Sequence, residues 1–295
     1  MNVLVTGGRG FVGRSVGRLL RRHGYRVVSL DTTPVGPGTD EVECDITDPA
    51  AVQKRFRSER IGAIVHLAAI LPTTAQREPL LATRVNVQAS VDLLEMAREF
   101  HVGRFVFGSS LSVYGTWPVD RVVSEEDRTS PADLYGAAKL YVERLGAAYR
   151  VAHGLESVSL RIGRVVGPGA RSATSGWRSE IFERIPDAGA GEIKIPYADS
   201  ERILLVHVED VAQMILKLVK APQLAHPVYN AACESVMVGE LKAEVERLNP
   251  RIHLQLGGRA VVGNPRHVDW SRFAQEFGFR VAPIFGQLNQ AAAGN

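Results

Sequence analysis

The sequence predicts a doubly wound α/β domain, built on a parallel sheet, with a smaller, interleaved C-terminal lobe. Short apolar runs alternate with longer segments of helical periodicity over residues 1–163, and a glycine-rich turn follows the first of these runs. The alternation ends near Arg164. Strands that alternate with helices form right-handed βαβ units, and such units place parallel strands in one sheet that is covered on both faces.

Several short segments have the β-branched and apolar composition of strands buried on both faces. They are residues 2–6, 25–30, 63–67, 104–108 and 157–161. Between them, apolar residues recur at helical spacing. This spacing predicts helices over residues 10–23, 49–58, 79–99 and 133–153.

The C-terminal part is expected to form the smaller lobe. Residues 170–200 are rich in Gly, Ser, Ala and Arg, so we expect a loop there with one helix at 177–185. A strand at 202–208 and helices at 209–220 and 239–248 follow. We assign residues 1–163 to the main domain, with its sheet completed by parts of 200–232, and residues 164–295 mainly to the lobe.

The composition argues against several classes of protein. The 35 Lys and Arg against 32 Asp and Glu give a net charge of +3, too small to indicate a nucleic-acid or anionic-membrane partner. The apolar stretch at 61–71 is interrupted by His66 and is too short for a membrane helix, and residues 1–6 do not read as a secretory signal. Cys44 and Cys233 lie far apart without a ligand cluster, so we expect no disulfide, no metal and a cytoplasmic location.

The turn between the first strand and the first helix predicts a dinucleotide site. Its sequence is Thr6-Gly7-Gly8-Arg9-Gly10-Phe11-Val12-Gly13. Glycines at positions 7, 10 and 13 allow a tight turn, a close approach of the backbone to a pyrophosphate, and close packing of helix on strand. The N-terminus of the helix offers unpaired N–H groups and the positive end of its dipole.

Asp31, directly after the second predicted strand, indicates the type of dinucleotide. A carboxylate at this place accepts hydrogen bonds from the adenosine ribose hydroxyls and repels a 2′-phosphate. The sequence therefore favours NAD over NADP. Arg9 leaves NADP open, because its guanidinium could face a 2′-phosphate.

Tyr135 and Lys139 lie one turn apart on a predicted helix, which places both on one face, about 5 to 6 Å apart at Cβ. A phenol with its ordinary pKa of about 10 is a poor base at neutral pH. A neighbouring ammonium and a positive nicotinamide ring both favour the phenolate. Ser109, Ser110 and Ser112 lie at the carboxyl end of the strand at 104–108, at the sheet edge where ligands bind, so a serine hydroxyl there can donate to a substrate oxygen.

These motifs, together with His66-Leu67-Ala68-Ala69, resemble those of the extended short-chain dehydrogenase/reductase family, the NAD-dependent epimerase/dehydratase group. The resemblance covers most of the chain. It implies a Rossmann fold, NAD as cofactor, Ser110, Tyr135 and Lys139 as a catalytic triad, and a homodimer through the helices at 79–99 and 133–153. The cofactor-binding residues expected from the turn and the resemblance are Gly7, Gly10, Phe11, Val12, Gly13, Asp31, Asp45, Ile46, Leu67, Ala68, Ala69, Asn86, Tyr135 and Lys139.

The chain departs from that family's pattern at two places. The family's dehydratases have an Asp-Glu pair directly after the catalytic Ser or Thr, where this chain has Leu111 and Ser112, so sugar dehydration is not expected. Its nucleotide-sugar epimerases have an Asn where this chain has Arg164. The run Leu160-Arg161-Ile162-Gly163 resembles uronate dehydrogenases, which oxidise a sugar acid.

Arginines are concentrated in the part of the lobe expected to cover the sheet edge, and their forks suit phosphate or carboxylate. The residues expected to contact substrate are Ser112, Arg164, Arg171, Arg178 and Arg202. For any one arginine, a solvated surface position is the alternative.

Three functions remain open on the sequence. The first is an NAD-dependent epimerase or oxidoreductase acting at a carbinol carbon of a sugar or nucleotide-sugar, with Tyr135 as base. The second is a dehydrogenase of a sugar acid that uses the same first half-reaction and then releases NADH. The third is a non-catalytic NAD-sensing protein, which the presence of Ser110, Tyr135 and Lys139 disfavours.

Overall fold

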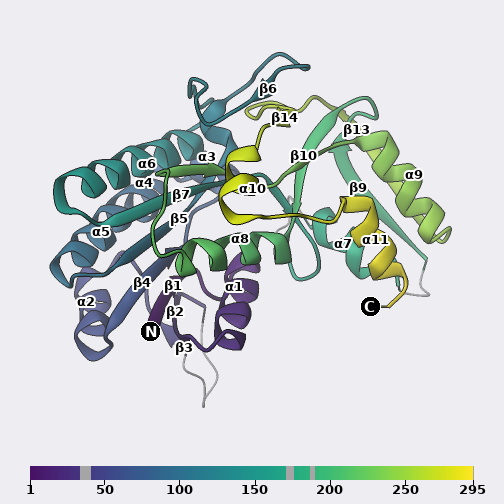
Figure 1. Ribbon diagram of the computed structural model, residues 1–295. Coiled ribbons are helices and arrows are strands. Elements are labelled where there is room, and N and C mark those ends of the chain that lie inside the picture. Colours follow the sequence, from purple (N-terminus) through teal and green to yellow (C-terminus); the bar gives the residue numbers. More distant parts are fainter. Residues whose placement is uncertain (34–40, 171–175, 187–189, 295) are drawn as a thin grey trace.

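The computed structural model describes residues 1–33, 41–170, 176–186 and 190–294. Figure 1 shows a larger α/β part and a smaller lobe. The strands of the larger sheet are β1 (Asn2–Thr6), β2 (Arg26–Asp31), β3 (Glu41–Glu43), β4 (Ile61–His66), β5 (Arg104–Ser110), β7 (Glu156–Ile162) and β11 (Val228–Asn230). They are parallel and form a seven-stranded sheet in the order β11-β7-β5-β4-β1-β2-β3.

Helices cover both faces of this sheet (Figure 1). On one face are α2 (Pro49–Ser58), α5 (Ala89–Glu99) and α6 (Leu134–His153), and on the other are α1 (Phe11–Arg22) and α8 (Val208–Lys220). Successive residues of β1 point to opposite sides: Val3 and Val5 belong to the core under α1 and α8, whereas Leu4 belongs to the core under α2, α5 and α6. The predicted doubly wound arrangement is confirmed.

The strand order reverses between β1 and β4. From this point β2 and β3 extend to one side, and β5, β7 and β11 to the other. Ligands of open α/β sheets bind beside the carboxyl ends of the two strands that flank such a reversal. Those ends are Thr6 and His66, which are paired with each other across the sheet.

The smaller lobe has its own sheets and core. The strands β8 (Arg164–Val166), β10 (Arg202–His207) and β12 (Glu234–Met237) form one sheet, and β9 (Gly191–Tyr197) pairs with β13 (Ile252–Arg259). Around them lie α7 (Trp177–Glu183), α9 (Val238–Leu248) and α11 (Ile284–Ala292). Buried side chains of all three helices, such as Ile181, Val245 and Leu288, share one hydrophobic core.

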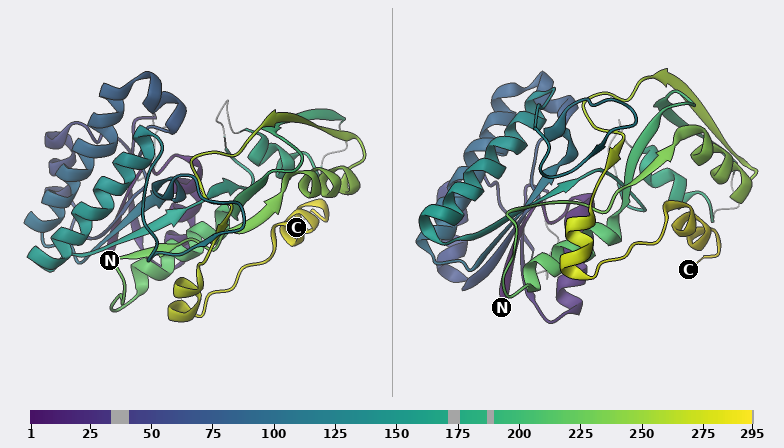
Figure 2. Two further views of the ribbon diagram at one scale, coloured as in Figure 1. Left: turned by 90° about the horizontal axis from the view of Figure 1, so that it is seen from above. Right: turned by 45° about the horizontal axis from the view of Figure 1, so that its top comes forward.

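The C-terminal segment returns to the larger part before it ends in the lobe (Figure 2). The helix α10 (Ser271–Phe277) packs beside β11, where Phe273 meets Tyr229 at a centroid distance of 5.7 Å. The short strand β14 (His267–Val268) pairs with β6 (Val122–Val123) from the larger part. The following helix, α11, lies in the lobe, so this segment connects both parts.

Two expectations need correction. The region 170–200 contains the strand β9 in addition to α7: Ile193 and Ile195 are buried while the residues between and before them are exposed, an alternation the sequence analysis overlooked. The helix expected over 79–99 is divided into α4 (Pro79–Thr83), a π-helical turn (Arg84–Gln88) and α5, and α3 (Pro72–Arg77) precedes it. The strand expected at 202–208 forms β10 of the three-stranded sheet, and β11, which lies within residues 200–232, joins the larger sheet.

Within the described ranges, no helix combines the length and apolar character needed to cross a bilayer. The same ranges contain no group of three or more His, Cys, Asp or Glu side chains placed to hold a metal ion.

Candidate active site

The turn between β1 and α1 has the geometry that a pyrophosphate requires. Gly7 has a φ of +66°, and a Cβ there would lie 2.8 Å from the Ala68 nitrogen. A Cβ on Gly13 would lie 2.1 Å from the Gly7 carbonyl oxygen. Each of these two positions therefore accepts only glycine. The helix α1 starts at Phe11 without a side-chain cap, which leaves its first N–H groups available to an anion.

Asp31, at the end of β2, is held against this turn. Its Oδ2 accepts a hydrogen bond from the Arg9 backbone N–H (3.0 Å), and its Oδ1 accepts from the N–H and hydroxyl of Thr33 (3.0 and 2.7 Å). The carboxylate is thereby fixed beside the glycine-rich turn, where it suits ribose hydroxyls and opposes a 2′-phosphate. The Arg9 guanidinium donates to the Thr33 carbonyl oxygen (3.3 Å). The donor set around the turn therefore fits NAD.

The residues expected near the adenine lie after β3. Asp45 is exposed, and its Oδ1 accepts hydrogen bonds from the N–H and the hydroxyl of Thr47, both at 2.8 Å. Ile46 is buried beside it. The local bonds hold the Asp45 carboxylate in a turn and leave its second oxygen, Oδ2, without a bond from these donors.

The segment after β4, residues 67–69, is partly buried and is supported from two sides. Its first two N–H groups donate to the Thr6 hydroxyl oxygen (3.2 and 3.3 Å). Asn86, in the π-helical turn, accepts from the Ile70 N–H (2.7 Å) and donates to the Ile70 carbonyl oxygen (2.9 Å). Such π turns are frequent at functional sites. Asn86 thus fixes the backbone that borders the glycine-rich turn.

His66 is buried between these supports and is a structural group. Its Nδ1 lies 2.6 Å from the Thr6 hydroxyl, and its Nε2 lies 2.9 Å from the Ser90 hydroxyl, which itself donates to the Asn86 carbonyl oxygen. Ser90 therefore accepts from Nε2–H, and Nδ1 accepts from Thr6. Burial, together with the positive charge of Lys139, lowers the pKa of His66 to about 3. The ring is neutral at physiological pH.

The structure brings Ser110, Tyr135 and Lys139 together at the carboxyl end of β5. Lys139 Nζ donates to the Gly108 carbonyl oxygen (2.7 Å) and lies 5.5 Å from the centre of the Tyr135 ring. The Ser110 hydroxyl lies close enough to the Tyr135 phenol to lower its pKa through a hydrogen bond. The helix that carries the pair begins with Asp133, whose side chain caps it.

Ser112 acts on Ser110. Its N–H and its hydroxyl both donate to the Ser110 hydroxyl oxygen, at 3.2 and 2.9 Å, and its side chain is buried. Because both acceptor positions of that oxygen are used, the hydrogen of Ser110 is left for Tyr135 or a substrate oxygen. As placed, Ser112, which we expected to contact substrate, orients the Ser110 hydroxyl.

Burial dominates the electrostatics of Ser110, Tyr135 and Lys139, the candidate catalytic set. It lowers the pKa of Lys139 to about 7, against the effect of the Glu143 carboxylate. It raises the pKa of Tyr135 to about 12, in the same direction as Asp133, while the Ser110 hydrogen bond and the Arg178 charge act against it. Another positive charge beside Tyr135, such as an oxidised nicotinamide ring, would act in the same direction as Arg178.

Arg164 lies in β8, the strand that follows β7 along the chain. It begins β8, two residues after Ile162, the partner of Ser110 in the β5–β7 register. Its guanidinium lies 5.4 Å from the centre of the Tyr197 ring, a cation–π contact. It has no ion pair with any described residue.

Arg178 lies in the first turn of α7 and is partly buried. Burial lowers its pKa to about 10, Arg164 acts in the same direction, and Tyr197 and Tyr135 act against both. The Arg178 guanidinium forms no hydrogen bond or salt bridge within the described part of the chain. Arg178 therefore lies near Tyr135 and Arg164 lies near Arg178. No ion pair with a carboxylate balances either charge among the residues that the structure describes.

The other arginines of the expected group lie elsewhere or cannot be placed. Arg202 begins β10 opposite Met237, and nothing among the described residues connects it to Tyr135. Arg171 lies outside the described residues. Arg184, from the same arginine-rich region, forms an ion pair with Glu180 at 3.1 Å.

A buried ion pair that was not predicted from the sequence lies beside Ser109 and acts on Lys139. Glu143 and Arg161 are both buried and are 2.7 Å apart between Oε2 and Nη2. The four-residue spacing could have pointed to Glu143. It follows Lys139 by one helical turn, so it extends the helix face that carries Tyr135 and Lys139.

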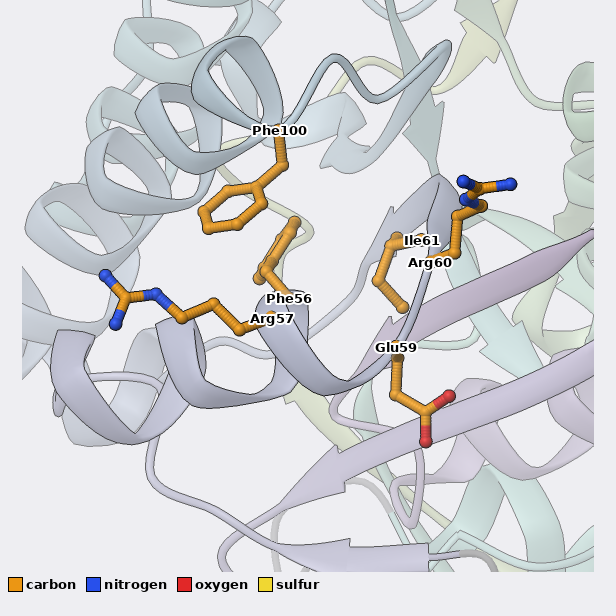
Figure 3. A pocket seen from close by; sticks show the side chains of 6 residues that line it. All are labelled: Phe56, Arg57, Glu59, Arg60, Ile61 and Phe100. Carbon is orange, nitrogen blue, oxygen red and sulfur yellow. The ribbon is translucent and has the colours of Figure 1, made fainter.

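Two pockets lie away from the catalytic set. Figure 3 shows one of about 240 Å³ between the end of α2, the beginning of β4 and Phe100. It is at the amino edge of the sheet, opposite the edge that carries Ser110. The other, of about 340 Å³, is lined by residues of β6, β14 and α10, including Trp270.

Comparison with known proteins finds relatives among nucleotide-sugar and sugar-acid enzymes. The family model described as the NAD dependent epimerase/dehydratase family matches residues 3–232. A D-erythronate dehydrogenase of Cupriavidus necator is 34% identical over 208 residues, which are 64% of this chain and 63% of that protein. The match covers between about half and two thirds of the length of this dehydrogenase and of similar UDP-glucose 4-epimerases.

Solved structures match over nearly the whole chain. The UDP-glucose 4-epimerase of Thermus thermophilus in complex with NAD is 25% identical, with a TM-score of 0.84 over 99% of this chain and 98% of that one. MoeE5 in complex with UDP-glucuronic acid and NAD is 28% identical, with a TM-score of 0.83 and the same coverage.

Proposed function

Because the chain belongs to the NAD-dependent epimerase/dehydratase family, we propose that it catalyses hydride transfer at a carbinol carbon of a sugar-type substrate, with Tyr135 as the base. The observation that supports this role is the meeting of Ser110, Tyr135 and Lys139 at the end of β5. NAD, when bound by the glycine-rich turn and Asp31, supplies the hydride acceptor.

Each side chain of the catalytic set has a separate task. The Ser110 hydroxyl, oriented by Ser112, donates to the substrate oxygen. Tyr135 Oη takes the carbinol proton, and the positive charge of Lys139 stabilises the phenolate that does so. One N–H of Lys139 is used by the Gly108 carbonyl oxygen, which leaves two donors for ribose hydroxyls of the cofactor.

Arg164 and Arg178 favour a substrate with a carboxylate over a neutral sugar. We propose a sugar acid as this substrate and its net oxidation, with release of NADH, as the reaction. A partly buried charge is costly when it lacks a counter-ion. A substrate carboxylate can accept from both guanidinium groups, and such charge-assisted bonds are stronger than neutral ones. A neutral sugar would leave both charges unbalanced beside Tyr135.

Incubation with NAD and a panel of aldonates, uronates, neutral sugars and UDP-sugars tests this function. We expect NADH to accumulate in proportion to substrate with the sugar acids. The Arg178→Gln variant is expected to raise KM for the acid by about 10- to 100-fold, because a hydrogen bond between two charged groups contributes about 1.5–3 kcal/mol.

Arg184→Gln is the matched control, because Arg184 follows the same helix and is already paired with Glu180. It should leave KM unchanged. Conversion of a UDP-sugar to its epimer without NADH accumulation would replace this function by epimerisation, and an unchanged KM in Arg178→Gln would remove the arginine from the substrate site.

We also propose that the chain forms a homodimer through α6 and α4. Leu134, Tyr141 and Val151 are exposed along one side of α6, and Leu80 and Leu81 are exposed on the neighbouring α4. Exposed apolar residues grouped on adjacent helices are typical of a surface that a partner covers. The proposal predicts a particle of twice 32.1 kDa by light scattering, reduced to one chain by Tyr141→Glu. A wild-type particle of one chain would refute it.

A further inference from the structure

We propose that Glu143 is a positioning residue of the reaction, which locks α6 against β5 and so holds Lys139 and Tyr135 at Ser110. The inference rests on the proposed function and extends it to a side chain that does not touch substrate or cofactor. Glu143 locks α6 against β5 together with Arg161, with which it forms an ion pair.

The first support is a row of contacts between the two elements. Tyr135, Lys139 and Glu143 follow one another at four-residue intervals, so they form one face of α6. Each of the three residues contacts one of the last three residues of β5. Tyr135 meets Ser110, Lys139 donates to the Gly108 carbonyl oxygen, and Glu143 accepts from the Ser109 hydroxyl.

The second support is the ion pair with Arg161. This arginine is paired with Ser109 in the β5–β7 register, so it approaches Glu143 from the next strand. Its Nε donates to both carboxylate oxygens (3.0 and 3.2 Å), and its Nη2 donates to Oε2 (2.7 Å). A bidentate pair fixes orientation as well as distance. Glu143 therefore joins three elements at one point.

Arg161 is itself braced from its other side. Its guanidinium lies 4.6 Å from the centre of the Tyr114 ring. The Tyr114 hydroxyl donates to the Asn230 side-chain oxygen (2.8 Å) and lies 2.9 Å from the Ser124 carbonyl oxygen. These contacts leave the arginine little freedom, so the geometry of Glu143 is set by the sheet and not by α6 alone.

Glu143 also acts on the charge of Lys139. The charged and titratable groups that face this ammonium are Glu143 and Tyr135 from α6, His66 from β4, and Arg161 behind Glu143. His66 is neutral, so the Glu143 carboxylate is the group that favours the ammonium against burial. Loss of this carboxylate lowers the pKa of Lys139 further, and the ammonium then deprotonates at a lower pH.

The charge of Lys139 decides the pH at which Tyr135 can act as a base. Tyr135 becomes a phenolate more easily while Lys139 is charged. When Lys139 loses its proton at lower pH, the phenolate forms only at higher pH. Removal of Glu143 is therefore expected to move the acid limb of the pH profile of kcat to higher pH by about one pH unit. At a pH below that limb, this shift corresponds to a roughly tenfold lower kcat.

The test compares Glu143→Gln with Glu143→Asp and with the double variant Glu143→Gln/Arg161→Met. The single Gln variant leaves Arg161 buried without its counter-ion and can fail to fold, whereas the double variant removes both charges. We expect the acid limb of kcat to shift in both Gln variants and to return toward the wild-type position in Glu143→Asp. Crystal structures are expected to show a longer Lys139 Nζ to Gly108 oxygen distance, and calorimetry a higher Kd for NAD.

Glu95→Gln is the matched control, because Glu95, like Glu143, accepts bonds from an arginine and from a side-chain hydroxyl, but it lies on α5, away from Lys139. It should move none of these quantities. A double variant that folds, with a wild-type kcat profile, wild-type Kd and an unchanged Lys139 contact, would overturn the proposal. If the wild-type protein turns over no substrate, the proposed function fails, while the Kd and the Lys139 contact still decide the role of Glu143.

Discussion

Replacement of Tyr135 by Phe is expected to lower kcat by about 10²- to 10⁴-fold, the usual contribution of a positioned general base. The ring and its packing remain, and only the phenol oxygen that takes the carbinol proton is lost. Because the turn at residues 7–13 and Asp31 are untouched, the Kd for NAD should stay within about twofold. Steady-state kinetics and calorimetry with NAD measure the two quantities.

Tyr141→Phe is the control for this experiment, because Tyr141 lies on the same helix but is exposed. It should leave kcat unchanged. Turnover by Tyr135→Phe close to that of the wild type would exclude Tyr135 as the base and would make Ser110 or a water molecule the next candidate.

Gly13→Ala is expected to weaken NAD binding by at least about 100-fold and to destabilise the fold by about 1–3 kcal/mol, as overpacked positions do. The new Cβ would lie 2.1 Å from the Gly7 carbonyl oxygen and 2.8 Å from the Gly8 Cα. Both are backbone atoms, so the turn itself must move. The displaced turn can no longer present its N–H groups to a pyrophosphate.

Calorimetric titration with NAD and urea unfolding measure these two losses. Gly258→Ala provides the comparison, because a Cβ at that position meets no atom within 4 Å and its φ is not positive. This variant should bind NAD as the wild type does. Wild-type affinity in Gly13→Ala would show that the turn tolerates the side chain and that the pyrophosphate binds elsewhere.

The features that the sequence predicted well are those that depend on neighbouring residues. The glycine-rich turn lies between one strand and one helix, so its geometry follows from eight consecutive residues. Tyr135 and Lys139 share a helix turn, and their proximity is fixed once the helix forms. The doubly wound fold follows in the same way from the alternation of strand and helix.

The features that were missed depend on the sheet register or on a short, irregular element. The Glu143–Arg161 pair forms because β7 lies beside β5 with Ser109 opposite Arg161. This register cannot be predicted from a local sequence pattern. The strand β9 was overlooked because its alternation spans a few residues within a Gly- and Ser-rich region. Which arginines approach Tyr135 depends in turn on how the lobe packs, so the sequence grouped Arg202 with Arg164 and Arg178.

The course of the C-terminal segment bears on how such a chain can evolve new specificity. The helix α10 contributes Phe273 and Phe277 to an aromatic cluster with Tyr229 of the larger part, while α11 belongs to the lobe. A lobe transplanted from a relative would therefore disturb the core of its host unless this cluster were rebuilt with it. Replacement of single side chains around Arg164 and Arg178 is the easier evolutionary route, because it leaves the packing between the larger part and the lobe unchanged.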